Sequence, residues 1–164
     1  MIYKIQHTEI EGNIKWTSIR DVGEDIDGHI LIWDEYRKVE DQYILLINNI
    51  FNVLNWPLLK PKKASFRDEG DNFYSHDEFK YFDPSKIVKK GNLMSRDEVM
   101  YFARWALREV CSFYVTFDSG FIICQCDYNL YISVDIDLID IIKDAGLHYQ
   151  VIDTAQLEDE VYDL

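Results

Sequence analysis

The chain has 164 residues and a mass of 19.5 kDa, with 48% apolar, 15% aromatic and 29% charged residues. This composition excludes a disordered, collagen-like or low-complexity chain, and the length favours one domain, residues 1–164, with a core of its own. The net charge is −13, from 30 Asp and Glu against 17 Lys and Arg. Because a negative field repels phosphate backbones and anionic membrane surfaces, we expect no direct binding to nucleic acid or membrane.

The N-terminal residues predict short strands. Apolar and polar residues alternate through residues 1–5, and the pattern resumes at Ile14 and Trp16 after a Glu-Gly-Asn turn, which favours two strands. A polar loop then leads to the apolar run 29–33, where we expect another strand.

Two longer helices are predicted on either side of an irregular connection. Apolar residues recur at helical spacing over residues 39–55, until Pro57 limits the helix. Residues 57–94 have mixed charge and little regular pattern, apart from a possible short strand at 79–82. Ser95-Arg-Asp-Glu98 is a capping box, so a helix should begin there, with an apolar face running to Val110.

The C-terminal third predicts a meander of strands. Two short polar turns separate three strand-like runs, at residues 112–117, 121–126 and 130–136. Residues 137–146 then indicate a short helix that Asp137 caps and Gly146 ends, and 148–152 a further strand. We expect residues 155–164 to form an acidic tail that frays. The expected fold class is α+β, a mainly antiparallel sheet packed by two longer helices and one short helix.

The enzyme-like feature of the sequence is Asp135-Ile-Asp137 with Asp140, because carboxylates that leave a strand together can hold a divalent cation. A structural explanation competes with this one: Asp137 stands where a helix cap belongs, and Asp140 falls in the first turn of the same helix. No phosphate-binding glycine loop accompanies these residues, and the four histidines lack zinc-ligand spacing. We therefore expect no enzyme activity, no metal and no cofactor.

The negative charge is concentrated at the carboxyl end. Residues 118–164 contain 11 acids and one base, Lys143, so they carry −10 of the net −13. Tyrosines stand among these acids, and a tyrosine within a carboxylate field suits an interface with a basic protein. The predicted partner-binding residues are Asp118, Asp127, Tyr128, Tyr131, Asp135, Asp137, Asp140 and Asp144.

The chain is small and acidic, its expected fold class is α+β, and acids are concentrated from Asp118 to Asp144. In these features it resembles bacterial immunity proteins of contact-dependent growth inhibition and related polymorphic toxin systems. This resemblance implies a non-enzymatic protein that neutralises a cognate basic toxin domain, often a nuclease. Two alternatives stay open: a phage-encoded nucleic-acid mimic that inhibits a host nuclease, and a divalent-metal-dependent enzyme that uses Asp135 and Asp137.

The cysteines and the first residues indicate a compartment. Cys111, Cys124 and Cys126 are odd in number and lack the spacing of a disulfide framework, which is typical of free thiols in a reducing environment. The first residues do not have the pattern of a signal peptide, and no apolar stretch is long enough to span a bilayer. We expect a cytoplasmic protein.

Overall fold

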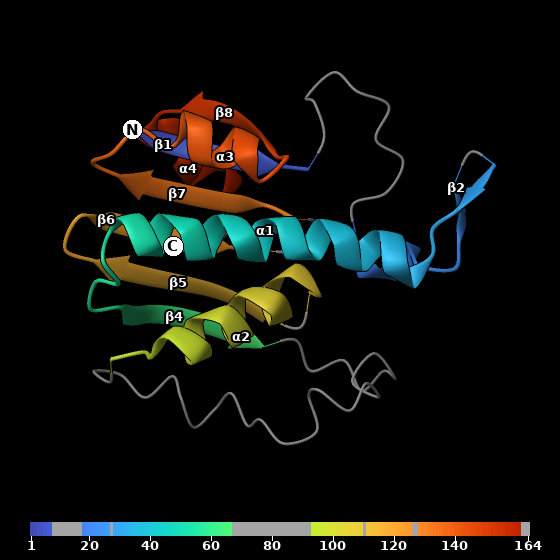
Figure 1. Cartoon of the computed structure of the whole chain (residues 1–164), viewed down its shortest axis with the longest axis horizontal. Helices are drawn as coiled ribbons and strands as arrows, with labels where there is room; N and C mark the ends of the chain where they lie inside the picture. Colours follow the sequence, from blue (N-terminus) through green and yellow to red (C-terminus); the bar gives the residue numbers. More distant parts are fainter. Residues whose placement is uncertain (8–17, 27, 67–92, 110, 126–127, 162–164) are drawn as a thin grey trace.

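The computed structural model describes residues 1–7, 18–26, 28–66, 93–109, 111–125 and 128–161 (Figure 1). Within these residues, a six-stranded antiparallel sheet has the order β4-β5-β6-β7-β1-β8, which confirms the α+β class and the C-terminal meander. The strands are β1 (Ile2–Gln6), β4 (Lys60–Phe66), β5 (Cys111–Phe117), β6 (Gly120–Cys124), β7 (Leu130–Val134) and β8 (His148–Ile152).

One face of the sheet carries the main core. Alternate residues of β5, such as Phe113 and Val115, are buried on this face, while Tyr114 and Thr116 between them are only half-buried. Helices α1 (Trp33–Val53), α2 (Arg96–Leu107) and α3 (Ile139–Asp144) pack on this face through a single apolar cluster, and α1 lies across it in Figure 1. These are the two longer helices and the short helix that the sequence predicts.

The opposite face is covered in part by α4 (Thr154–Glu160), where a frayed tail was expected. The Asp153 carboxylate caps this helix by accepting the N–H of Gln156 at 2.8 Å. Leu157 and Val161 are buried against sheet residues that include Ile123. The expectation of a frayed end is therefore wrong for residues 155–161, because the buried Leu157 and Val161 hold them on the sheet.

Around α1 the structure differs from the expected strand at residues 29–33. Only His29 and Ile30 form strand β3, which pairs with β2 (Asp25–Ile26) in a separate hairpin, and a short 3-10 helix (Ile19–Asp21) precedes it. Helix α1 already begins at Trp33, upstream of the predicted start, since the Glu35 carboxylate accepts the N–H of Ile32 in its first turn.

Strand β4 lies inside the connection that the sequence left irregular. Its residues Lys60-Pro-Lys-Lys have no strand pattern of their own, and the strand exists because it pairs with β5. The strands expected at residues 14–16 and 79–82 lie outside the described residues.

The β7–α3–β8 segment follows the prediction closely. Helix α3 begins at Ile139, and its N-cap is Leu138 rather than the expected Asp137. Asp137 stands one residue upstream of the cap, where its carboxylate accepts the N–H of Ile139 at 2.9 Å. Gly146 ends the helix at a φ of +72°, and β8 follows as predicted. Cys111 and Cys124 are buried free thiols. In the described part of the chain, no helix is both long and apolar enough to cross a bilayer.

Candidate protein-binding surface

Several of the predicted aspartates meet at one end of the sheet. Gly120, which opens β6, pairs with Val134 at the end of β7, so the turn that carries Asp118 lies beside Asp135. The pairing is close: a Cβ on Gly120 would lie 1.7 Å from the Ser133 carbonyl oxygen. The absence of a side chain at Gly120 is therefore what lets the turn approach β7.

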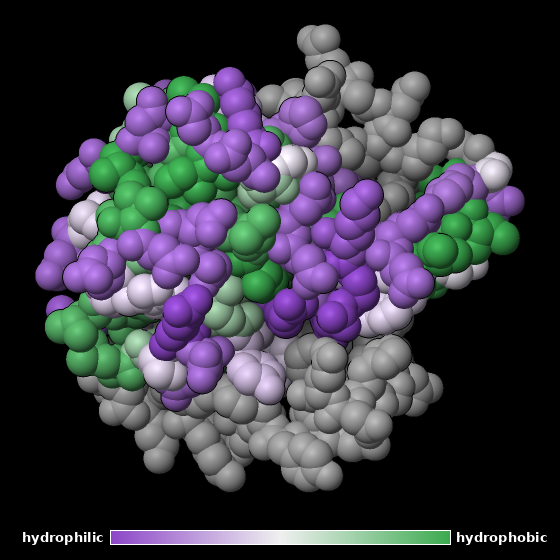
Figure 2. Space-filling view, in the orientation of Figure 1, coloured by the Kyte–Doolittle hydropathy of each residue, from purple (hydrophilic) through white to green (hydrophobic). Residues whose placement is uncertain are grey.

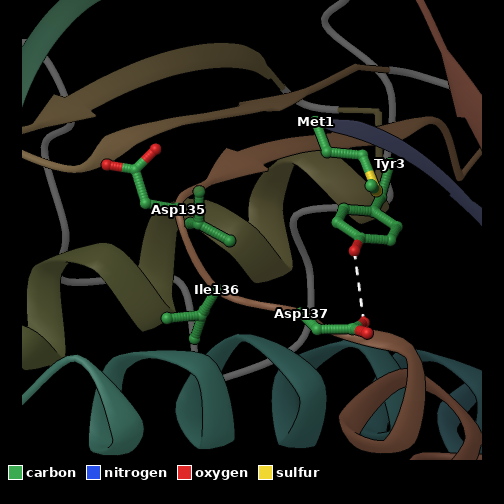
Figure 3. A pocket seen from close by; sticks show the side chains of 6 residues that line it. Met1, Tyr3, Asp135, Ile136 and Asp137 are labelled. Carbon is green, nitrogen blue, oxygen red and sulfur yellow. Dashed lines mark hydrogen bonds between the residues drawn. The ribbon is translucent and has the colours of Figure 1, made fainter.

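A pocket of about 330 Å³ opens at the same end, lined by Met1, Tyr3 and residues 134–137 (Figure 3). The Tyr3 hydroxyl donates a 3.3 Å hydrogen bond to the Asp137 carboxylate and accepts the N–H of Leu138 at 3.4 Å. Burial and the neighbouring Asp137 charge raise the pKa of Tyr3, although the Leu138 bond opposes them. In Figure 3 the Asp135 carboxylate points away from this bonded pair, so it is presented to solvent.

Helix α3 extends the acidic area beyond the pocket. Asp140 and Asp144 are four residues apart and both are exposed, so they share one side of the helix. Ile142, which is fully buried, anchors the helix to the core. Figure 2 shows hydrophilic residues mixed with apolar ones on the surface where α3 lies in Figure 1.

Two arginines near the end of α2, Arg104 and the C-cap residue Arg108, neutralise acids elsewhere in the protein. Glu40 on α1 is fully buried and accepts hydrogen bonds from Arg108 at 2.5 and 2.9 Å and another from Arg104. Arg104 also bonds Asp41 at 2.9 Å. These guanidinium charges are therefore used between α1 and α2, away from the end of the sheet.

The predicted aspartates have no such compensation. All five that the structure describes are exposed, and no ion pair between described residues involves them. Their charge is therefore offered to solvent or to a partner. We call this set the acidic surface: Asp118, Asp135, Asp137, Asp140 and Asp144.

The two predicted tyrosines do not belong to this surface. Tyr128 is 1% exposed and packs against Tyr36 and Tyr43 beneath α1, and burial raises its pKa. Tyr131 is 2% exposed because α4 covers it, and its hydroxyl donates to Glu160 at 2.8 Å. The prediction that these tyrosines contact a partner from the protein surface is wrong. Asp127 lies outside the described residues.

Three further acids, which are not among the predicted partner-binding residues, lie near β8 in the fold. Asp153, Glu158 and Asp159 are exposed on or beside α4. The sequence contains a signal for helix α4, because Asp153 and Gln156 have the spacing of a capping box directly after a predicted strand.

Comparison of the chain with protein-family models, with curated proteins and with solved structures gives no match. Among the residues that the structure describes, no three His, Cys, Asp or Glu side chains are grouped so that they could hold a metal ion. The geometry of the acidic surface is therefore the basis for a functional proposal.

Proposed function

We propose that this chain is a non-enzymatic, cytoplasmic immunity protein that binds and neutralises a cognate basic toxin domain through the acidic surface. One observation carries the proposal: five exposed aspartates share one end of the sheet and the adjoining α3, and no ion pair between described residues neutralises them.

Unpaired carboxylates of this kind affect both the rate and the specificity of binding. Their field attracts a basic partner and raises the association rate, and it repels acidic competitors. Since both tyrosines are buried, apolar contact has to come from other side chains. Met1, which is 70% exposed, and Ile136 line the pocket between the acids and supply such contact.

The test uses the carboxyl-terminal domain of the protein encoded by the reading frame beside this one. The expected result is that this domain is toxic when expressed alone and is neutralised and bound when the two chains are expressed together. We expect Asp140→Lys with Asp144→Lys to weaken binding by about tenfold or more, mainly through the association rate, and to abolish protection at low expression.

A matched control variant separates the effect of where the charges are reversed from the effect of the change in net charge. Glu24→Lys with Asp34→Lys changes the net charge equally, at two exposed acids near the β2–β3 hairpin and the start of α1. The control should weaken binding much less. Equal losses for the two double variants, or a neighbouring domain that does not bind, would contradict the proposal. Binding to several unrelated DNA-binding proteins would instead favour the nucleic-acid mimic.

A further inference from the structure

We propose that the outer edge of β8 receives an extended basic segment of the partner as an added strand of the sheet. This inference rests on the proposed function and names how the partner is held. In strand addition, main-chain hydrogen bonds supply affinity, and the side chains of the added strand supply specificity.

The first observation is that β8 is an edge strand. It pairs with β1 from Ile2↔Ile152 to Gln6↔His148, and within the described residues no other strand pairs with it. Side chains on both faces of its centre are open to solvent: Gln150 is exposed, and Val151 is 47% exposed. A row of backbone N–H and C=O groups along such an edge can pair with another chain.

The second observation is the contrast with β4 at the other edge of the sheet. Strand β4 has the features that block unwanted pairing, namely Lys60, Pro61, Lys62 and Lys63 and a register shift between Pro61 and Lys63. Strand β8, with the sequence His-Tyr-Gln-Val-Ile, has no lysine and no proline, and its pairing with β1 is regular. Strand β4 therefore has features that oppose pairing with another chain, and strand β8 lacks them.

The third observation is the charge on either side of β8. Helix α3 precedes β8 on one face of the sheet and carries Asp140 and Asp144. Helix α4 follows β8 on the other face and carries Glu158 and Asp159. Because successive side chains of a strand point to opposite faces, lysines or arginines of an added strand have carboxylates available on both sides.

The same charges argue against a second copy of this chain as the occupant. Each copy has a net charge of −13 and would bring its own α3 and α4 acids to the junction. Like charges brought together in this way oppose association. A basic extended segment is therefore the occupant that the edge fits.

The test uses a capped peptide of alternating lysine and valine at millimolar concentration, with hydrogen exchange of the protein's amides as the readout. We expect the peptide to slow exchange within residues 148–152 by about threefold or more, because added main-chain bonds protect the edge. Two control peptides should have no such effect: the same peptide with alternate amides N-methylated, and one with glutamate in place of lysine. No protection of β8 by the lysine peptide would overturn the proposal.

A pair of protein variants tests the site independently. Val151→Lys places a gatekeeper charge on the edge, whereas Leu58→Lys makes the same change at a 63% exposed leucine elsewhere. We expect about a fivefold loss of peptide affinity in the first variant and less than about twofold in the second. Equal losses, or a dimer in light scattering whose interface protects β8 without peptide, would overturn the proposal.

The outcome is distinguishable from failure of the proposed function. If the toxin domain binds and the α3 charge reversals weaken it, while neither peptide nor toxin domain protects β8, strand addition is wrong and the inhibitor function stands. If the toxin domain does not bind, the inhibitor function is wrong whatever the peptide does.

Discussion

Glu40 on α1 and Arg108 at the end of α2 form a two-bonded ion pair, with donor–acceptor distances of 2.5 and 2.9 Å, in a site where the carboxylate is fully buried. The guanidinium also lies 5.3 Å from the centre of the Trp33 ring. The pair joins the two long helices over the sheet, and it uses a positive charge that is consequently absent from the protein surface.

Breaking this pair on one side should be costly. Arg108→Ala leaves the Glu40 carboxylate buried with less compensation, so we expect a loss of about 3–5 kcal/mol in the free energy of unfolding, measured by urea denaturation. Arg96→Ala is the control, because Arg96 is exposed although it stacks on Trp56, and it should cost less than about 1 kcal/mol. Equal costs would show that the buried pair contributes little.

Gly120 should not tolerate a side chain. Because an alanine Cβ would lie 1.7 Å from the backbone oxygen of Ser133, β6 and β7 would have to separate, and we expect a loss of about 3 kcal/mol or more. Gly28→Ala is the comparison: it has open space but a φ of +86°, so it should cost about 1 kcal/mol. Thermal unfolding of both variants checks the order, and a milder effect at Gly120 would contradict the close approach.

The attachment of α4 should weaken in acid. The Glu160 carboxylate lies 2.7 Å from Lys4 Nζ and 2.8 Å from the Tyr131 hydroxyl. Burial alone would raise the pKa of Glu160, but these two contacts outweigh it and hold the pKa below the usual 4.5. The folded pKa is therefore the lower one. The stabilisation is complete above about pH 4.5 and is lost as the pH falls through the folded value.

We expect Glu160→Gln to flatten this acid-dependent part of stability. Because Glu160 is partly exposed, the difference should stay under about 1 kcal/mol. Glu158→Gln, at an exposed position of the same helix, should leave the profile unchanged. The midpoints of urea denaturation, measured from about pH 3 to about pH 6, distinguish the two variants. If stability depends on pH in the same way in both variants, Glu160 is not the cause of the acid-dependent loss.

Magnesium should not stabilise the folded protein. One Asp137 oxygen already accepts hydrogen bonds from the Tyr3 hydroxyl and the Ile139 N–H, and in Figure 3 Asp135 points away from that pair. We expect millimolar MgCl₂ or MnCl₂ to shift the Tm no more than sodium chloride of equal ionic strength. A larger, saturable shift with either metal would contradict this prediction and favour the metal-dependent enzyme.

Local signals in the sequence predicted much of this fold. The Ser95 capping box marks the start of α2, and its side chain accepts the N–H of Glu98 as predicted. The two polar turns mark the meander, and the alternation in β5 marks its buried face. Such features succeed because the interactions that create them lie within a few residues of one another.

Features that depend on distant contacts were not predictable. The Tyr43 hydroxyl donates a hydrogen bond to the backbone oxygen of Tyr128, which is 85 residues away in the sequence. Tyr128 is buried there with a backbone φ of +55°. Tyr131 is buried in a cluster that includes Leu157 of α4, which packs on this face of the sheet. Whether a tyrosine in a turn or a strand is exposed depends on which other elements pack over it. The sequence around the tyrosine does not predict those elements. Acidic side chains are easier to place, since burying them unpaired is costly.

The position of β1 bears on when the sheet is completed during synthesis. Ile2 pairs with both Ser133 and Ile152, so β1, the earliest of the described strands in chain order, lies between β7 and β8, the two latest. Contacts so distant in sequence make folding slow, and the pairing of β1 with β8 cannot be complete before residue 152 has emerged from the exit tunnel. The sheet that carries the acidic surface is therefore completed late, so under the proposed function a nascent chain would not neutralise the toxin until translation of this region is over.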